Sequence, residues 1–462
     1  MTHAGETSPS NFRTHLAVEW RALAFLMGCA ALAVPLLFPG RIPGAVLVAA
    51  LAGLATLFAW RALSSGTLVP RTPVDWPNLL FLLLLPLGVW ASADPMTSWP
   101  AVYKIIAGWA ILYGLAGLAG SAWMRYLPGV FLTGSLVLAL LMVAGTRWFP
   151  GKGLLPSILY DFLPTRFLPW QSEGTHPNLT GGAMVILLPP AVALAAWSRT
   201  RWLRILAIIA VILVALVLML TQSRGAWVAA VVALLLMPLL RYRRWWMVVV
   251  IAGIVGGVIL LLTRPGWLVS NLFEPVQTTG TSLDTLPSRI ELWIRSLAIV
   301  RDFGLSGVGP GMFERVVMVL YPPFFNEFTG EFIHAHNIFL LTAAELGIPG
   351  LIAQLAMFLA LAAGLVVASK SWQSREQKDS ATADLTALAI GLFGSLIAYA
   401  SHGLTDAPLV AQRGYALSFA VFGAAAAVST HLLTRPCLDE SSGASTSSSG
   451  DSDSREDPEQ TS

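Results

Sequence analysis

Charged side chains are scarce in this sequence. Asp, Glu, Lys and Arg make up 11% of its 462 residues, whereas 56% of the residues are hydrophobic and the mean hydropathy is +0.70. A soluble domain carries about 25% charged residues, so the composition excludes that class. It predicts an integral membrane protein.

Cysteine and net charge are also low. The two cysteines, Cys29 in an apolar segment and Cys437 in a polar tail, exclude a disulfide framework and a cysteine-ligated metal cluster. A net charge of +3 is too small to indicate a nucleic-acid partner. No clear small-residue cleavage site follows the first apolar segment, which favours a retained helix over a signal peptide.

Long apolar segments dominate what is present. A membrane-spanning helix needs roughly 17 to 25 mainly apolar residues. About twelve segments meet this condition to within a few residues, and they predict an all-α, polytopic integral membrane protein. The predicted helices are 21–38, 43–63, 77–92, 101–120, 127–146, 178–197, 202–220, 225–240, 245–262, 350–369, 385–403 and 413–432.

The distribution of Lys and Arg predicts the orientation. With both termini in the cytoplasm, the inside loops hold twelve of these residues and the short outside loops hold three. Basic residues concentrate in short cytoplasmic loops, whereas long translocated loops are largely exempt. We therefore expect an even number of helices and two cytoplasmic termini.

Five parts follow along the chain. They are a cytoplasmic N-terminal segment (1–20), helices one to nine (21–262), a large extracytoplasmic loop with a re-entry segment and the candidate site (263–349), helices ten to twelve (350–432) and a cytoplasmic tail (433–462). The tail is rich in Ser, Asp and Glu and has too few apolar residues to form a core, so it is predicted to be disordered.

The stretch Pro287–Gly350 holds much of the polar sequence that could carry chemistry. Ser288 and Glu291 fit a capping box, with Ser288 as the helix N-cap. Arg289 then occupies the first helical position, where the helix dipole disfavours a cation. This misfit indicates an anion held by Arg289 and free backbone amides, although an arginine pointing into water is the more frequent arrangement. Arg295 has a simpler explanation, because Glu291 offers it an ion pair.

Two histidines, His334 and His336, end the long polar loop. A histidine titrates near neutral pH and can serve as a general base. A metal site is weakly indicated, because no acidic or cysteine partner stands at ligand spacing. Hydrogen bonds to the backbone or to lipid headgroups are the common alternative for histidines at a membrane surface.

Two shorter features also lie outside the apolar segments. Arg224 stands in a very short turn, residues 221–225, between two apolar helices, and a guanidinium at the membrane edge usually has a partner. The glycine-rich stretch 304–311 resembles a phosphate-binding loop in composition. No strand precedes it and no Lys-Ser/Thr pair follows, so it predicts a tight turn.

Two further charged residues leave their roles open. Lys104, near the start of a predicted helix, can extend its amine to the interface or serve a function within the membrane. Asp406, near His402 after the eleventh helix, can be a proton-relay carboxylate or an ordinary loop residue.

Three stretches form a pattern when they are taken together. They are Thr221-Gln222-Ser223-Arg224-Gly225-Ala226; the helix from Ser288 to Asp302 with Gly307-Val308-Gly309-Pro310-Gly311-Met312-Phe313; and His336-Asn337-Ile338-Phe339-Leu340 with Glu345-Leu346-Gly347-Ile348-Pro349-Gly350. A weaker fourth is His176-Pro177-Asn178. In order and spacing they resemble the O-antigen ligase and polymerase superfamily of polytopic bacterial glycan transferases, over about residues 170 to 350.

The resemblance implies a glycosyltransferase of the O-antigen ligase or polymerase type. Such an enzyme transfers or polymerises a glycan from a polyprenyl-diphosphate carrier, such as undecaprenyl diphosphate, onto an acceptor hydroxyl at the outer face of the bacterial inner membrane. The implied partners are that donor, a glycan or glycolipid acceptor and the lipid bilayer. The implied reaction uses no metal, nucleotide or other cofactor, and nucleic acid is not among the implied partners.

The resemblance also implies roles for individual residues. His336 and Arg289 would be catalytic, with His336 as the base at the acceptor hydroxyl. Arg224, Asn337 and His334 would bind substrate, and Arg224 and Arg289 together would hold the donor diphosphate. His334 leaves the identity of the base open, although Asn337 favours His336. Arg224, Arg289 and His336 are expected to converge on one outward-facing cavity.

Two functional questions stay open. Ligase and polymerase are not separated by the sequence, because both use similar arginines. The superfamily also contains members described as inorganic-carbon transporters, and residues 402–406 are similar to them. A transporter of a small anion such as bicarbonate is therefore the alternative, resting on Lys104, Asp406 and the membrane-edge arginines. No convincing internal repeat supports it.

Overall fold

The protein is a bundle of long helices. The computed structural model describes residues 9–148, 156, 158–163, 174–263, 286–322, 334–373, 379–407 and 414–444. These residues form helices and connecting turns without a β-strand, and one isolated bridge joins Thr146 to Thr175. The all-α prediction is therefore confirmed for this part of the chain.

Every predicted apolar segment overlaps a helix. The twelve helices concerned are α1 (Pro9–Leu37), α2 (Gly44–Ser65), α3 (Asp75–Ala91), α4 (Pro95–Ala116), α5 (Leu127–Gly145), α7 (Pro177–Trp197), α8 (Arg201–Leu220), α9 (Arg224–Leu236), α10 (Trp246–Thr263), α14 (Ile338–Gln373), α15 (Ser380–Gly403) and α16 (Gly414–Ala444). Within the described residues, nine helical stretches are long and apolar enough to cross a membrane, and three apolar helices are shorter. The protein is therefore multi-pass, while the number of crossings stays a prediction.

Local sequence explains where several helices begin. Asp94 accepts a hydrogen bond from the backbone N–H of Met96, and Pro95 follows as the first residue of α4. Asp379 caps α15 in the same way by accepting from Ala381 and Thr382. These caps satisfy backbone donors that a helix start leaves without an intrahelical partner.

Three helices extend well past their predicted bounds. α1 begins at Pro9, twelve residues before the predicted start at 21. α14 begins at Ile338, twelve residues before the predicted start at 350, and continues through a kink at Gly347 (φ 72°) and Pro349. Glycine and proline indicated a boundary, but the helix continues on both sides of the kink. α16 runs to Ala444, so the predicted disordered tail from 433 begins as helix, and residues 445–462 lie outside the described residues.

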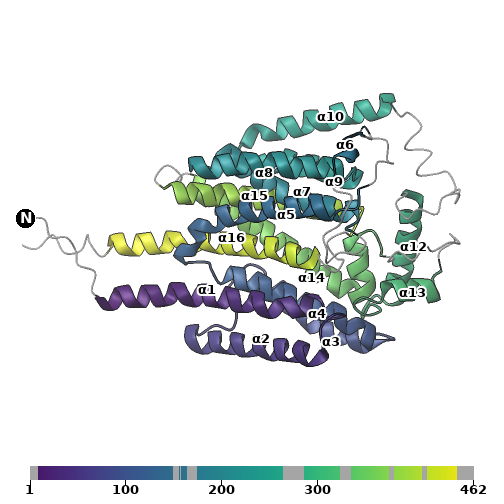
Figure 1. The fold of residues 1–462 in the computed structure, drawn as a ribbon, viewed down its shortest axis with the longest axis horizontal. Coiled ribbons are helices and arrows are strands. Elements are labelled where there is room, and N and C mark those ends of the chain that lie inside the picture. Colours follow the sequence, from purple (N-terminus) through teal and green to yellow (C-terminus); the bar gives the residue numbers. More distant parts are fainter. Residues whose placement is uncertain are drawn as a thin grey trace, which may run out of the picture.

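α7 and α15 form the centre of the bundle. In the most apolar stretch of each helix, 78% of the residues are buried in α7 and 83% in α15, against 17% in α2 at the edge. Glycines allow the two central helices to approach closely, because a Cβ at Gly391 would lie 2.4 Å from the Cα of Pro190. The start of α1 and the end of α16 lie at one end of the bundle, and α12 and α13 lie at the other (Figure 1).

The polar end of the bundle carries a small helical module. It consists of α12 (Leu286–Asp302), α13 (Phe313–Leu320) and the glycine turn between them, residues 304–311. The predicted tight turn is present, with positive φ at Gly307, Gly309 and Gly311. The turn packs on the kink of α14, where Gly309 N donates to Glu345 O at 3.0 Å and Ile348 N donates to Gly304 O at 2.7 Å. The kink therefore serves as the docking point of the module.

Candidate active site

Asp406 lies at the centre of the polar residues at this end of the bundle. It follows the C-terminal end of α15, and its backbone N–H donates to the carbonyl of His402 at 2.9 Å. Only 6% of its side chain is exposed. Its Oδ1 accepts from the backbone N–H of Ala407 at 2.8 Å. A buried carboxylate needs compensating partners, which come from two other segments.

The first partner is Arg289 on α12. Its Nη1 donates to the backbone carbonyl of Thr405 at 2.5 Å, and its Nη2 lies 3.7 Å from Asp406 Oδ2. Only 15% of the Arg289 side chain is exposed. The guanidinium therefore does not point freely into water, which was the more frequent alternative for an arginine at this position.

The second partner is His336, just before α14. Its Nδ1 lies 3.2 Å from Asp406 Oδ1. Because a carboxylate only accepts, Nδ1–H is the donor, and the neutral ring then presents Nε2 as an acceptor. His336 also has a φ of 45°, which few residues without a glycine's freedom adopt.

His334 lies directly against His336. Their ring centroids are 4.1 Å apart, and His334 Nδ1 accepts a hydrogen bond from the backbone N–H of His336 at 3.1 Å. This bond supports the unusual backbone of His336. The structure thus gives His334 a contact with the candidate base, beside the substrate-binding role that the resemblance implies.

The protonation states follow from burial and neighbouring charge. Burial alone would raise the pKa of the Asp406 carboxyl, but the hydrogen bond from His336 and its electrostatic attraction outweigh burial and hold that pKa well below its usual range. Burial lowers the pKa of His334 to about 3, and His336 and Arg289 contribute to this lowering. At neutral pH, Asp406 is therefore ionised and His334 is neutral.

Asn337 uses its side chain to fix the local backbone. Its Oδ1 accepts from the backbone N–H groups of Phe339 and Leu340 at 2.9 and 3.0 Å, and its Nδ2 donates to the carbonyl of Leu404 at 3.1 Å. The first two bonds cap the start of α14, and the third joins it to the end of α15. These contacts explain Asn337 as a residue that holds two elements together, next to the implied substrate contact.

Arg224 begins α9 and has an exposed side chain. Its neighbour Gly225 lies against the end of α15, since a Cβ there would lie 2.7 Å from Thr405 Oγ1. The turn before it is rigid, because Gln222 has a φ of 51° and its buried amide donates to Tyr160 Oη. The structure therefore brings Arg289 and His336 together on Asp406, and it places the turn of Arg224 beside the same segment of α15.

The capping-box prediction is wrong in its register. α12 begins at Leu286, so Ser288 and Arg289 lie inside the first turn rather than at the N-cap and the first helical position. The predicted pair is confirmed, with Arg295 Nη2 2.7 Å from Glu291 Oε1.

The cluster also has ligand atoms at metal spacing. One atom each from His334, His336 and Asp406 lies within 4.8 Å of the others. The guanidinium of Arg289 is next to the same carboxylate, and its fixed positive charge opposes a second cation. The arrangement suits an anionic substrate group better than a metal ion.

Asp406 is the residue that the sequence-based site lacked. It stands seventy positions after His336, and its flanking sequence favoured a proton relay or a loop equally well. A signal was present, because a carboxylate at the end of an apolar helix needs a cationic or hydrogen-bonding partner. No spacing rule identified Arg289 or His336 as the partners of this carboxylate.

Comparison with known proteins fits this geometry. A search of curated proteins finds no match, whereas the sequence model of the O-antigen ligase family matches residues 209–355. The matched segment contains Arg224, Arg289 and His336 and ends before Asp406. The match confirms, over residues 209–355, the predicted resemblance to the O-antigen ligase and polymerase superfamily.

Proposed function

We propose that the protein transfers or polymerises a glycan from a polyprenyl-diphosphate carrier onto an acceptor hydroxyl at the outer face of a bacterial inner membrane. The observation that carries this proposal is the meeting of Arg289 and His336, both inside the family match, on the buried carboxylate of Asp406. A carboxylate, an imidazole and a guanidinium in contact supply a base and a binding group for an anion.

His336 is the general base in this mechanism. Asp406 holds Nδ1–H and stabilises the imidazolium that forms, as a buried carboxylate does for histidine in hydrolase triads. Nε2 takes the proton from the acceptor hydroxyl while its oxygen attacks the anomeric carbon. The bond from that carbon to the diphosphate oxygen breaks, and the polyprenyl diphosphate leaves, so a single displacement inverts the anomeric configuration.

The arginines stabilise the leaving diphosphate. Charge develops on its oxygen as the glycosidic bond breaks, and guanidinium groups in a partly dehydrated site offset that charge. Arg289 already holds Thr405 O and Asp406, so its direction is fixed before the donor binds. Arg224, exposed at the start of α9, is the second diphosphate ligand, and the reaction needs neither metal nor nucleotide.

The two charged residues on which the transport alternative rests, Asp406 and Lys104, have other partners in the structure. Asp406 is bound to Arg289 and His336, and Lys104 interacts electrostatically with Glu345 of α14. The family match supports a glycan ligase or polymerase and gives the transport reading no support. The acceptor, a second glycan or a glycolipid, distinguishes polymerase from ligase and is identified by supplying each in turn.

Reconstituted protein with a polyprenyl-diphosphate glycan and acceptor tests the proposal. Arg289→Ala should lower the transfer rate by about 100-fold or more, because it removes charge stabilisation at the leaving group. Arg295→Ala is the matched control, since Arg295 lies on the same helix but pairs with Glu291, and it should transfer at the wild-type rate. A chelator should have no effect. Full transfer by Arg289→Ala would exclude the assigned mechanism.

A further inference from the structure

A second polar feature lies behind Asp406, inside the bundle. His402, on the last turn of α15, is 3% exposed, and its Nε2 has no hydrogen-bond partner among the described residues. The ring lines a pocket with residues from three helices. These are Gly182, Val185 and Ile186 of α7, Ile338 of α14, and Tyr399 and Gly403 of α15.

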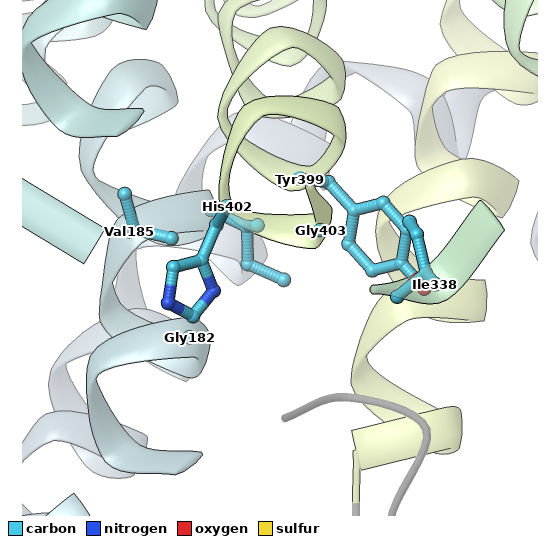
Figure 2. A pocket seen from close by; sticks show the side chains of 7 residues that line it. Gly182, Val185, Ile338, Tyr399, His402 and Gly403 are labelled. Carbon is cyan, nitrogen blue, oxygen red and sulfur yellow. The ribbon is translucent and has the colours of Figure 1, made fainter. Parts of the chain in front are cut away.

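Figure 2 shows how the ring is aimed. The imidazole of His402 points from α15 toward Gly182 and Val185 of α7, while Tyr399 points to the other side, toward Ile338. A buried imidazole nitrogen without a partner costs free energy, so this direction requires a ligand with polar atoms. The wall around it is otherwise apolar.

The opposite wall offers a carbonyl that lacks its regular donor. Pro189 and Pro190 lie inside α7, and proline has no N–H for the carbonyl four residues earlier. The carbonyls concerned belong to Val185 and Ile186, which both line the pocket. The hydroxyl of Ser395 donates to Ile186 O at 2.6 Å and replaces the missing N–H there, whereas Pro189 denies Val185 O the regular helical donor.

We propose that this pocket binds one water molecule, which accepts from His402 Nε2–H and donates to the carbonyl of Val185. The space suits a single water, and a water needs two or more polar partners to be held in a protein interior. Through this bridge His402 is a positioning residue for the transfer reaction. The second half of the proposal rests on the proposed function.

The backbone carries the effect to the site. The carbonyl of His402 accepts from the N–H groups of Thr405 and Asp406 at 3.0 and 2.9 Å, so the turn that presents Asp406 is built on His402. The ring also packs near Gly225, where a Cβ would lie 3.4 Å from His402 Cδ2. A bridge from His402 to α7 therefore fixes the end of α15 between the turn of Arg224 and the Asp406–His336 pair.

The test combines a density map with kinetics of the full chain in lipid nanodiscs. A high-resolution map should show water within hydrogen-bond distance of His402 Nε2 and Val185 O. His402→Phe should lower kcat roughly tenfold with KM for the donor unchanged, because a shift of the base costs rate rather than donor binding. His402→Gln, which keeps a donor near Nε2, should stay within about twofold of wild type.

Two variants away from His402 complete the test. Val185→Ile should fill the water site and reproduce the loss in kcat with His402 intact. Val137→Ile makes the same change on the exposed face of α5, away from the pocket, and should behave as wild type. Water density missing from the wild-type map, or equal kcat values for Val185→Ile and wild type, would overturn the inference.

The two proposals fail in different ways. The density map tests the water whether or not the protein shows transfer activity. Absence of transfer in every variant including wild type would therefore contradict the proposed function, while the map would still test the water site. If His402→Phe does not fold, Val185→Ile and His402→Gln still give the kinetic answer.

Discussion

The carboxylate of Asp406 is bound by residues from three parts of the chain. His336 Nδ1 and Arg289 Nη2 approach its two oxygens, and the backbone N–H of Ala407 donates to Oδ1. A group in this position both orients the imidazole and balances the guanidinium. Replacing Asp406 by asparagine therefore keeps the shape of the site and removes the negative charge.

Asp406→Asn should retain the fold and lower kcat by about 100-fold to 10,000-fold. The amide keeps the side-chain volume, but it no longer stabilises an imidazolium and permits the wrong tautomer of His336. The rate is measured in the reconstituted transfer assay. Asp302→Asn is the matched control, because Asp302 pairs with Arg301 and Tyr321 at the exposed end of α12. Equal rates for both variants would argue against a His336–Asp406 pair.

The lowered pKa of His334 predicts that the fold loses stability in acid. Its pKa falls from 6.5 in the unfolded chain to about 3 in the folded chain, so the unfolded chain binds more protons between these values. Stability is complete above pH 6.5 and is lost as the pH falls. Asp406 also has a lowered pKa, but its contribution is lost only below about pH 4, near the pKa of a free carboxyl. Burial raises the pKa of Glu345 to about 7, so other groups also titrate between pH 7 and pH 5, and the contribution of His334 is the difference between wild type and a variant that lacks this histidine.

Acidification from pH 7 to pH 5 should destabilise the wild type by on the order of 1 kcal/mol at this site, after allowance for its partial exposure. His334→Asn keeps an acceptor for the backbone N–H of His336 but does not titrate, so its thermal midpoint should fall less over the same interval. The midpoints are measured in detergent at both pH values. An unchanged pH dependence in the variant would assign the effect to another group.

At the scale of elements, the glycine turn docks α12 on the kink of α14. Gly307 and Gly347 both have positive φ, and each lies against the other segment's backbone. A Cβ at Gly307 would lie 2.3 Å from the carbonyl carbon of Glu345. The position of Arg289 therefore depends on two glycines that carry no chemistry.

Gly307→Ala should lower the thermal midpoint far more than Gly66→Ala. Both residues have a φ near 70°, but a Cβ at Gly66 meets nothing within 4 Å, so only the backbone strain of about 1 kcal/mol applies there. Gly307→Ala adds a collision with backbone that cannot rotate away, and a further loss of several kcal/mol is expected. Similar midpoints for the two variants would show that the turn does not dock as tightly as described.

At the scale of the whole molecule, apolar runs predicted the membrane helices because their length alone sets that assignment. The start of α14 was missed. Gly347 and Pro349 indicated a boundary near residue 350, whereas the side chain of Asn337 caps the helix so that it begins at Ile338, twelve residues earlier. Arg289 and His336 were found through local motifs. Asp406 was not joined to them, because its contacts come from segments 70 and 117 positions away and depend on packing.

The same contrast holds for orientation and function. The start of α1 and the end of α16 lie at the end of the bundle opposite α12 and α13 (Figure 1), while the even number of crossings stays a prediction. Which side is cytoplasmic remains a prediction from the basic residues in the loops. The family match over residues 209–355 indicates the type of transfer. The sugar and the acceptor are identified by supplying candidate substrates, because one fold serves many substrates.

Glycan transfer by His336→Ala is the most direct test of the account. Wild type and variant are compared in the same vesicles, with the same polyprenyl-diphosphate glycan and acceptor, after a thermal scan shows that both are folded. We predict that wild type forms the product with inverted anomeric configuration and that His336→Ala transfers at least about 100-fold more slowly. Transfer by His336→Ala at the wild-type rate would contradict the assignment of the His336–Asp406 pair as the catalytic base.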